Sequence, residues 1–171
     1  MIYKIRYWPD AFLKKVANPV KEFDAELEEI CQNMFDTMYD DKGIGLAATQ
    51  VGIDKRIFVL DTKFRDDGIC DALINPEIVE ASEEMVIYPE GCLSFPNIFI
   101  HLQRHARIKM KYYTLTGDEK HVILEGISSV CAQHEFDHLN GIVFLDHLKP
   151  VKRQMAEKKV RKEIKRKRKE K

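Results

Sequence analysis

Apolar positions recur every three to four residues between residues 24 and 41, which predicts an amphipathic helix. Its inner face consists of Leu27, Ile30, Met34 and Met38. Asp24 is a suitable N-cap, and the Asp-Asp-Lys-Gly run at 40–43 ends the pattern. A short helix is also expected at 11–16, and Pro150 is placed to open a basic C-terminal helix.

The middle of the chain carries short runs of β-branched and aromatic residues, which predict strands. The predicted strands are 56–61, 72–75, 77–81, 85–88, 107–115 and 121–124. A Thr-Gly-Asp turn at 116–118 suits a hairpin between the last two. Because the strands cluster between helices without regular alternation, we expect an α+β fold with mainly antiparallel sheets around a central helix.

The central helix is predicted at 126–140, and it carries the most informative residues of the chain. Its buried stripe consists of Ile127, Val130, Cys131, His134 and His138. Because His134 and His138 are four residues apart, they lie on one face and can present ring nitrogens to one cation. Glu135 points about 100° away and stays free to act as a general base on a metal-bound water. A structural hydrogen bond would explain one buried histidine, but the pair with its glutamate favours a metal site.

Composition is that of a globular protein. The chain has 171 residues, 44% hydrophobic and 33% charged, which suits one domain rather than two. It has no apolar run of the ~18 residues that a membrane-spanning helix needs, and its start does not resemble a secretory signal. The four cysteines show no paired spacing, so we expect reduced thiols. We therefore expect a cytoplasmic protein without membrane contact, and a monomer.

Charge is distributed unevenly, although the net charge is zero. Residues 149–171 carry 13 Lys or Arg and three Glu, a net charge of +10, which leaves −10 on residues 1–148. Such a tail can attract a polyanion such as nucleic acid, or can simply be a solvated helix end, and both interpretations stay open. We expect a catalytic domain at 1–148, with 149–171 as a basic helix or tail of the same domain.

A catalytic metal site usually has three protein ligands and one open position. One class of protease would need a third histidine at position 144, which is Phe144 here. A zinc metallopeptidase of the His-Glu-x-x-His class could instead use Glu157, although that residue lies among basic residues. Upstream, Cys92 as a thiolate would complete a Cys-His-His set. Its ligand softness admits Zn²⁺, Fe²⁺, Co²⁺ or Ni²⁺.

Three blocks of sequence resemble the motifs of bacterial-type peptide deformylases, in the same order and with similar spacing. They are Gly-Ile-Gly-Leu-Ala-Ala-Thr-Gln at 43–50, Glu-Gly-Cys-Leu-Ser at 90–94 and Gln-His-Glu-Phe-Asp-His-Leu at 133–139. The resemblance runs from about residue 7 to residue 148. It implies a metal-dependent hydrolase that removes the N-formyl group from the formylmethionine of nascent proteins.

The resemblance also implies a role for each motif residue. Cys92, His134 and His138 would bind the metal, Fe²⁺ in the cell, with Zn²⁺, Ni²⁺ or Co²⁺ as possible substitutes. Glu135 would be the general acid/base, while the Gln50 amide and the Leu93 backbone N–H would stabilise the oxyanion. The residues expected to bind substrate are Ile44, Gly45, Tyr88, Gly91, Ile127, Val130 and Cys131. The basic C-terminal helix would contact the ribosome.

The chain departs from the family pattern near the second block. Phe99 stands where an arginine is frequent, and the Tyr88-Pro89 pair is also unusual. We hypothesise that Phe99 makes the rim more apolar and favours hydrophobic residues downstream of the methionine. Neither Gln133 nor Arg104 is assigned a catalytic role; a plain surface position would explain each residue, and the resemblance implies that Arg104 shapes the rim.

Overall fold

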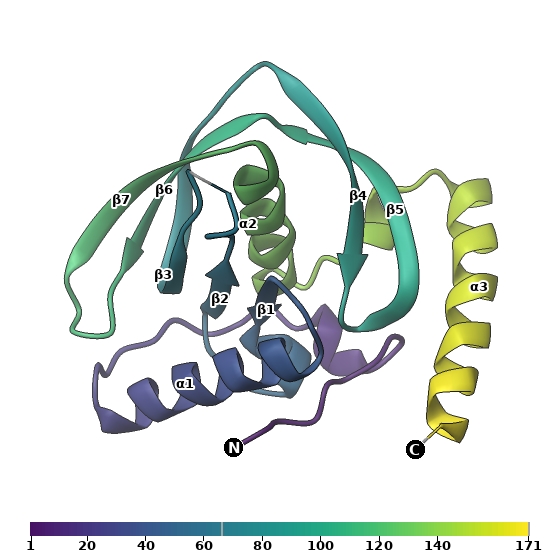
Figure 1. Ribbon diagram of the computed structural model, residues 1–171, viewed down its shortest axis with the longest axis horizontal. Helices are drawn as coiled ribbons and strands as arrows, with labels where there is room; N and C mark the ends of the chain where they lie inside the picture. Colours follow the sequence, from purple (N-terminus) through teal and green to yellow (C-terminus); the bar gives the residue numbers. More distant parts are fainter. Residues whose placement is uncertain (66, 171) are drawn as a thin grey trace.

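The computed structural model describes residues 1–65 and 67–170, and it has the predicted α+β architecture (Figure 1). The α-helices are α1 (Ala25–Asp40), α2 (Gly126–Leu139) and α3 (Pro150–Lys169), with 3₁₀ turns at Ala11–Lys14, Ala48–Val51 and Phe144–His147. The strands are β1 (Gly45–Ala47), β2 (Ile57–Asp61), β3 (Cys70–Ala81), β4 (Met85–Cys92), β5 (Phe95–His105), β6 (Arg107–Tyr113) and β7 (Glu119–Glu125). They form one sheet in the order β1-β2-β3-β6-β7 and a second, β4-β5, with antiparallel neighbours throughout.

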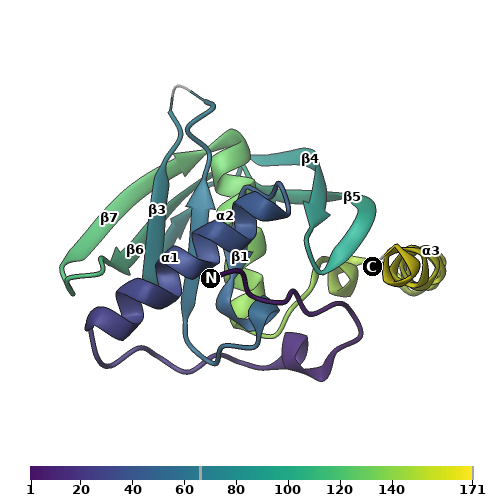
Figure 2. The same ribbon diagram turned by 60° about the horizontal axis from the view of Figure 1, so that its bottom comes forward.

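The larger sheet is covered by one helix on each face. Side chains alternate along a strand, so Ile57 and Val59 of β2 pack with α1, while Phe58 and Leu60 pack with residues of α2. Figure 2 shows α1 crossing one face of this sheet, and Figure 1 shows α2 enclosed between the sheet and the β4-β5 hairpin. The helix with the histidines is therefore central, as predicted.

Local signals explain the helix boundaries. The Asp24 side chain accepts a hydrogen bond of 2.9 Å from the Leu27 N–H and caps α1. The end of α1 is closed by a bond of 2.8 Å from the Gly43 N–H to the Met38 carbonyl. After α2, Gly141 has φ +71°, and a Cβ there would lie 2.3 Å from the Lys14 carbonyl oxygen, so only glycine fits.

Every predicted strand overlaps a strand of the structure, but two strands were not predicted. The two strands expected at 72–75 and 77–81 are one strand, β3, interrupted by a register shift at Asn75 and Pro76. β1 and β5 were missed. β1 has only three residues, whereas β5 carried a readable signal, since Ile98, Ile100 and Leu102 alternate with exposed residues.

The C-terminal helix α3 packs against β5 and is not a solvated tail. Val160 and Ile164 are buried in an apolar cluster with Trp8, Phe95 and Ile98. The Arg161 guanidinium also lies over the Trp8 ring, 5.2 Å from its centroid. The interpretation of residues 149–171 as a merely solvated end is therefore wrong for this packed face.

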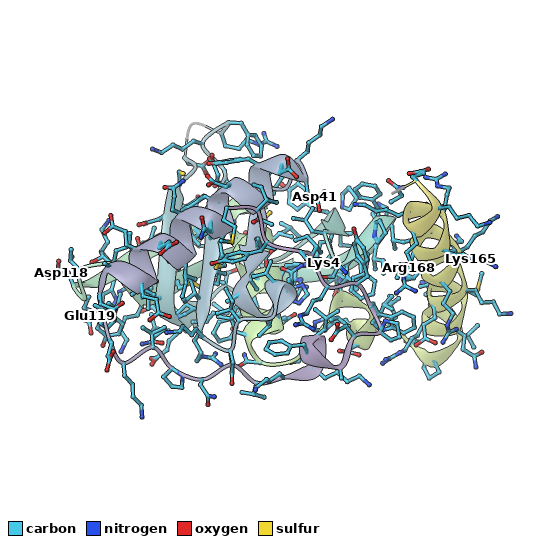
Figure 3. The ribbon with its side chains drawn as sticks, turned by 90° about the horizontal axis from the view of Figure 1, so that it is seen from below. Lys4, Asp41, Asp118, Glu119, Lys165 and Arg168 are labelled. Atoms are coloured by element: carbon cyan, nitrogen blue, oxygen red, sulfur yellow. The ribbon has the colours of Figure 1, made fainter. Side chains whose placement is uncertain are left out.

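The basic helix α3 lies at one end of the molecule. Figure 3 shows Asp118 and Glu119, in and just after the β6-β7 turn, at the opposite end from α3 with its Lys165 and Arg168.

Among the helices within residues 1–65 and 67–170, none combines the length and the apolar character that crossing a bilayer would require.

Candidate metal centre

Three potential ligands from distant parts of the chain converge at the centre of the molecule. Cys92 comes from the end of β4, while His134 and His138 project from successive turns of α2. The Cys92 Sγ lies 3.3 Å from the His138 Nε2, which lies 3.2 Å from the His134 Nε2. A register shift between Glu90 and Cys92 changes the pairing of β4 at this point, so Glu90 and Cys92 both face α2.

The donor set and its surroundings fit a divalent cation. The potential ligand atoms all lie within 4.8 Å of one another, and a sulfur with two imidazole nitrogens is a set that Zn²⁺ and Fe²⁺ accept. Burial opposes charge on His134, yet the charge of Cys92 and the hydrogen bonds to Cys92 and Glu90 raise the pKa of His134 well above the usual value. Burial and the charge of His134 hold the pKa of His138 well below the usual value. His138 is thereby kept as a neutral imidazole, the form in which histidine binds a metal.

A buried ionic network orients His134 from behind. The His134 Nδ1 lies 3.0 Å from the Glu90 Oε1, which leaves Nε2 facing the other ligands. Arg104 donates two bonds to the Glu90 carboxylate, of 2.8 and 2.9 Å, and a third of 2.8 Å to the Asp137 Oδ2. His147 also bonds to Asp137, at 2.8 Å. Burial would raise the pKa of both carboxyls, but these hydrogen bonds and charges hold both values below the usual range.

The predictions for Arg104 and Gln133 were wrong. The Arg104 side chain is only 6% exposed, because alternation along β5 places it on the inward face with Ile100 and Leu102. Gln133 is buried as well, and its amide nitrogen donates to the His105 and Ser129 carbonyls while its oxygen accepts from the His105 N–H. Gln133 therefore fastens α2 to the end of β5.

Glu135 lies beside the ligands with one oxygen available. Its Oε2 has no hydrogen-bond partner in the part of the chain that the structure describes. Burial, and then the nearby charge of Glu90, raise the pKa of Glu135 to about 7. A Cβ at Gly45 would lie 2.7 Å from the Glu135 Oε1, so the glycine of the first block provides the space for this carboxyl.

Gln50 is fixed with its amide nitrogen toward the site. Its Oε1 accepts a bond of 2.9 Å from the Ala47 N–H. This directs the Nε2 to the Ser94 Oγ at 3.1 Å and to the Cys92 Sγ at 3.5 Å. Leu93 follows the cysteine, and its side chain packs against Gly43, where a Cβ would lie 2.9 Å from the Leu93 Cδ1. Both residues predicted to stabilise an oxyanion thus adjoin the ligand group.

A cleft of about 660 Å³ leads from this site to the surface. It is lined by every residue predicted to bind substrate: Ile44, Gly45, Tyr88, Gly91, Ile127, Val130 and Cys131. Cys92, Leu93, His134 and Glu135 also line it, whereas His138 is 1% exposed and lies behind them. The sequence did not indicate that Arg166, Lys167 and Glu170, at the end of α3, would line the same cleft.

Glu157, the alternative third ligand, does not belong to the metal-binding group. Its carboxylate accepts a hydrogen bond of 3.0 Å from the Arg153 Nε and lies 4.0 Å from the Arg161 guanidinium, within α3. The group that can hold a metal contains Cys92 and not Glu157.

Comparison with known proteins agrees with this geometry. A family model described as polypeptide deformylase matches residues 2–154. A peptide deformylase of Thermotoga petrophila is 45% identical over 159 residues, covering 93% of this chain and 94% of that protein.

Two solved structures show the same fold. A peptide deformylase from Legionella pneumophila is 40% identical, with a TM-score of 0.92, and the match covers 100% of this chain and 99% of the other. One from Ehrlichia chaffeensis in complex with actinonin is 38% identical, with a TM-score of 0.88, covering 94% and 96%. Family model, sequence relatives and solved structures thus agree over nearly the whole length: the chain belongs to the peptide deformylase family of hydrolases.

Proposed function

We propose that this protein removes the formyl group from N-formylmethionyl peptides, and that Cys92, His134 and His138 hold its catalytic metal. The observation that carries the proposal is the convergence of these three ligands at the inner end of a cleft, beside the Glu135 carboxylate, whose Oε2 has no partner among the described residues. Ile44, Tyr88, Ile127, Val130 and Cys131 offer the apolar wall that a methionine side chain requires. Gly45 and Gly91 also line the cleft, and we propose that their backbone faces the peptide.

Each residue near the ligands has a chemical task in this proposal. A bound divalent cation supplies Lewis acidity, which polarises a carbonyl and makes water acidic near neutral pH. Glu135 takes a proton from the attacking water and returns it to the departing amine, for which a pKa of about 7 is well matched. The Gln50 amide and the Leu93 N–H donate to the oxygen that becomes negative when the formyl carbon is attacked.

Release of formate from formyl-Met-Ala-Ser tests this function. The wild-type protein should release it, and acetyl-Met-Ala-Ser should be a much poorer substrate. Cys92→Ser and Glu135→Ala should both lose most of the activity. Absence of formate from the metal-loaded wild type, or full activity of Cys92→Ser, would contradict the proposal.

The metal is expected to be Fe²⁺, with Zn²⁺ as a common substitute. The thiolate and imidazole ligands do not by themselves select between these ions. Protein purified anaerobically should contain about one iron per chain and lose activity on exposure to air, and Zn²⁺ should then occupy the site. Stoichiometric zinc with full activity after anaerobic purification would reject iron as the native metal. Metal analysis of Cys92→Ala prepared in parallel shows how much of the iron is held at this site.

Phe99 is expected to favour hydrophobic residues at the second and third positions of the substrate. Its ring is 69% exposed at the cleft rim and lies against Gly91, where a Cβ would be 3.0 Å from the ring. In Phe99→Arg, the kcat/KM ratio of Leu to Ser peptides at these positions should fall about two- to fivefold, which corresponds to losing part of one apolar contact. Phe64→Arg, at another exposed phenylalanine, is the matched control. An unchanged ranking in Phe99→Arg would reject the role.

The exposed face of α3 is expected to contact the ribosome through phosphate groups. Since Val160 and Ile164 are buried, truncation at Pro150 would expose the core, so charge variants are the better test. A triple Lys→Gln variant at Lys158, Lys162 and Lys165 should co-sediment less with ribosomes at low salt, and the difference in affinity from the wild type should shrink as salt rises. The same triple change at Lys14, Lys21 and Lys63, which are exposed elsewhere, should have little effect. Equal loss in both variants would reject docking by α3.

The remaining expectations fit this function. We propose that the protein works in the cytoplasm, where nascent chains are available to it, and that it is a monomer. We also propose that residues 1–148 and 149–171 form one domain, because α3 shares an apolar cluster with β5.

A further inference from the structure

We infer that Arg166 and Lys167 of α3 form a cationic outer end of the substrate cleft and favour peptides with acidic residues beyond the third position. The inference rests on the deformylase function proposed above. It assigns to the basic helix a part in substrate selection, separate from any contact with the ribosome.

The outer end of the cleft is built from three segments. The first half of β5 contributes Asn97 and Phe99, the segment just after α1 contributes Asp41 and Lys42, and the end of α3 contributes Arg166, Lys167 and Glu170. In Figure 3, Asp41 lies at the end of α1 nearest to α3. A peptide that leaves the metal centre along this cleft therefore passes between α3 and the α1 terminus.

α3 is held firmly enough for its side chains to act as a wall. Ile164 is buried in the cluster around Phe95, two and three residues before the cations that line the cleft. The Asn97 Nδ2 donates a bond of 3.2 Å to the Glu163 Oε2, which ties α3 to β5. Lys167 also lies over the Tyr7 ring, 5.4 Å from the centroid.

The cations at this end of the cleft are only loosely paired with anions. Here the lining residues comprise three cations, Lys42, Arg166 and Lys167, and two anions, Asp41 and Glu170. The Lys167 Nζ lies 3.8 Å from the Asp41 Oδ1, and the Arg166 Nε lies 3.9 Å from the Glu170 Oε1, too far for hydrogen bonds. Arg166 has one closer partner, with its Nη2 3.1 Å from the Glu163 Oε2. The cations therefore keep N–H donors for another carboxylate.

The chemistry of the substrate determines which residues meet these cations. With the formyl group at the metal centre and methionine against the apolar wall, the second and third residues pass Gly91 and Phe99. An extended peptide advances about 3.3 Å per residue, so the fourth residue lies about 10 Å beyond the first. Arg166 and Lys167 can thus bind the carboxylate of an aspartate or glutamate at the fourth or fifth position of the peptide.

The test compares formyl-Met-Ala-Ser-Asp-Asp with formyl-Met-Ala-Ser-Asn-Asn, which differ in charge and hardly in shape. In the wild type, kcat/KM should be about three- to tenfold higher for the Asp peptide at low salt, the effect expected of two partly exposed charge contacts. In the double variant Arg166→Gln/Lys167→Gln, the ratio should fall to about one. At 1 M salt, where screening acts within about 3 Å, the wild-type ratio should also approach one.

Lys165→Gln/Lys169→Gln is the matched control, because it removes two charges from the same turns of α3 outside the cleft lining. Figure 3 shows Lys165 on the side of α3 turned away from the molecule. This control should keep the wild-type ratio. A wild-type ratio of one, an unchanged ratio in Arg166→Gln/Lys167→Gln, or an equal fall in the control would overturn the inference. Failure of the deformylase function itself would differ from all three, since no formate would be released from either peptide.

Discussion

Replacing Glu135 with glutamine is expected to lower kcat for formate release by about 10²–10⁴-fold, the range that general acid–base catalysis contributes. The amide has nearly the same shape but can neither take nor return a proton. Since Glu135 is not among the three ligand residues, the metal content should stay near one ion per chain. The measurement is kcat on formyl-Met-Ala-Ser together with metal analysis of the same preparation.

Two further variants make this result interpretable. Glu83→Gln makes the same chemical change at an exposed position and should leave kcat unaltered. Cys92→Ala should lose both activity and metal, which separates loss of a ligand from loss of a proton acceptor. If Glu135→Gln keeps kcat within about threefold of the wild type, less than any general base contributes, another group must move the proton.

Arg104→Met is expected to lower the free energy of unfolding by about 3–5 kcal/mol, the cost of leaving a buried charge without its partner. The guanidinium is the only cationic side chain bonded to Glu90 other than His134, among the residues that the structure describes, and it also bonds to Asp137. Methionine keeps much of the volume of Arg104 and leaves both carboxylates without its hydrogen bonds. Urea unfolding of both proteins at neutral pH measures the difference.

The pH dependence of this difference has a definite sign. In the wild type the folded-state pKa values of Glu90 and Asp137 lie below their unfolded values of about 4, so the stability they add is present above pH ~4 and is lost as the pH falls through the folded-state values. Without Arg104, both buried carboxyls protonate more readily. The difference in the free energy of unfolding between wild type and Arg104→Met should therefore be largest at neutral pH and should shrink in acid.

Arg107→Met is the control for Arg104→Met. Arg107 forms an ion pair of 3.0 Å with Glu125, but the two side chains are 52% and 57% exposed. Losing this ion pair should lower the free energy of unfolding by less than about 1 kcal/mol at any pH. If the two variants were equally stable, the buried network would not be what stabilises the centre of the molecule.

The sequence predicted those parts of the structure that depend on neighbouring residues. The Asp24 cap, the apolar face of α1 and the two histidines one turn apart on α2 are local patterns, and the structure contains each of them. The pairing of Cys92 with the histidines came from family motifs, because its 42-residue separation from His134 leaves no local trace. Sequence patterns alone left Glu157 as an alternative ligand.

The errors concern residues whose setting is decided by tertiary contacts. Arg104 is a charged residue in a run that was not recognised as a strand, so its burial beside Glu90 could not be inferred. The alternation at Ile98, Ile100 and Leu102 would have placed Arg104 on the inner face, had it been used. The position of Arg166 and Lys167 at the cleft follows from the angle at which α3 packs on β5, which no local pattern specifies.

β5 contributes both to the apolar cluster beneath α3 and to the wall of the cleft. Its Ile98 packs in one apolar cluster with Val160 of α3, while Phe99, the next residue, lines the cleft. Because side chains alternate along a strand, two adjacent residues of β5 face the helix and the cleft. A change in how α3 packs on Ile98 would therefore also shift the backbone that carries Phe99.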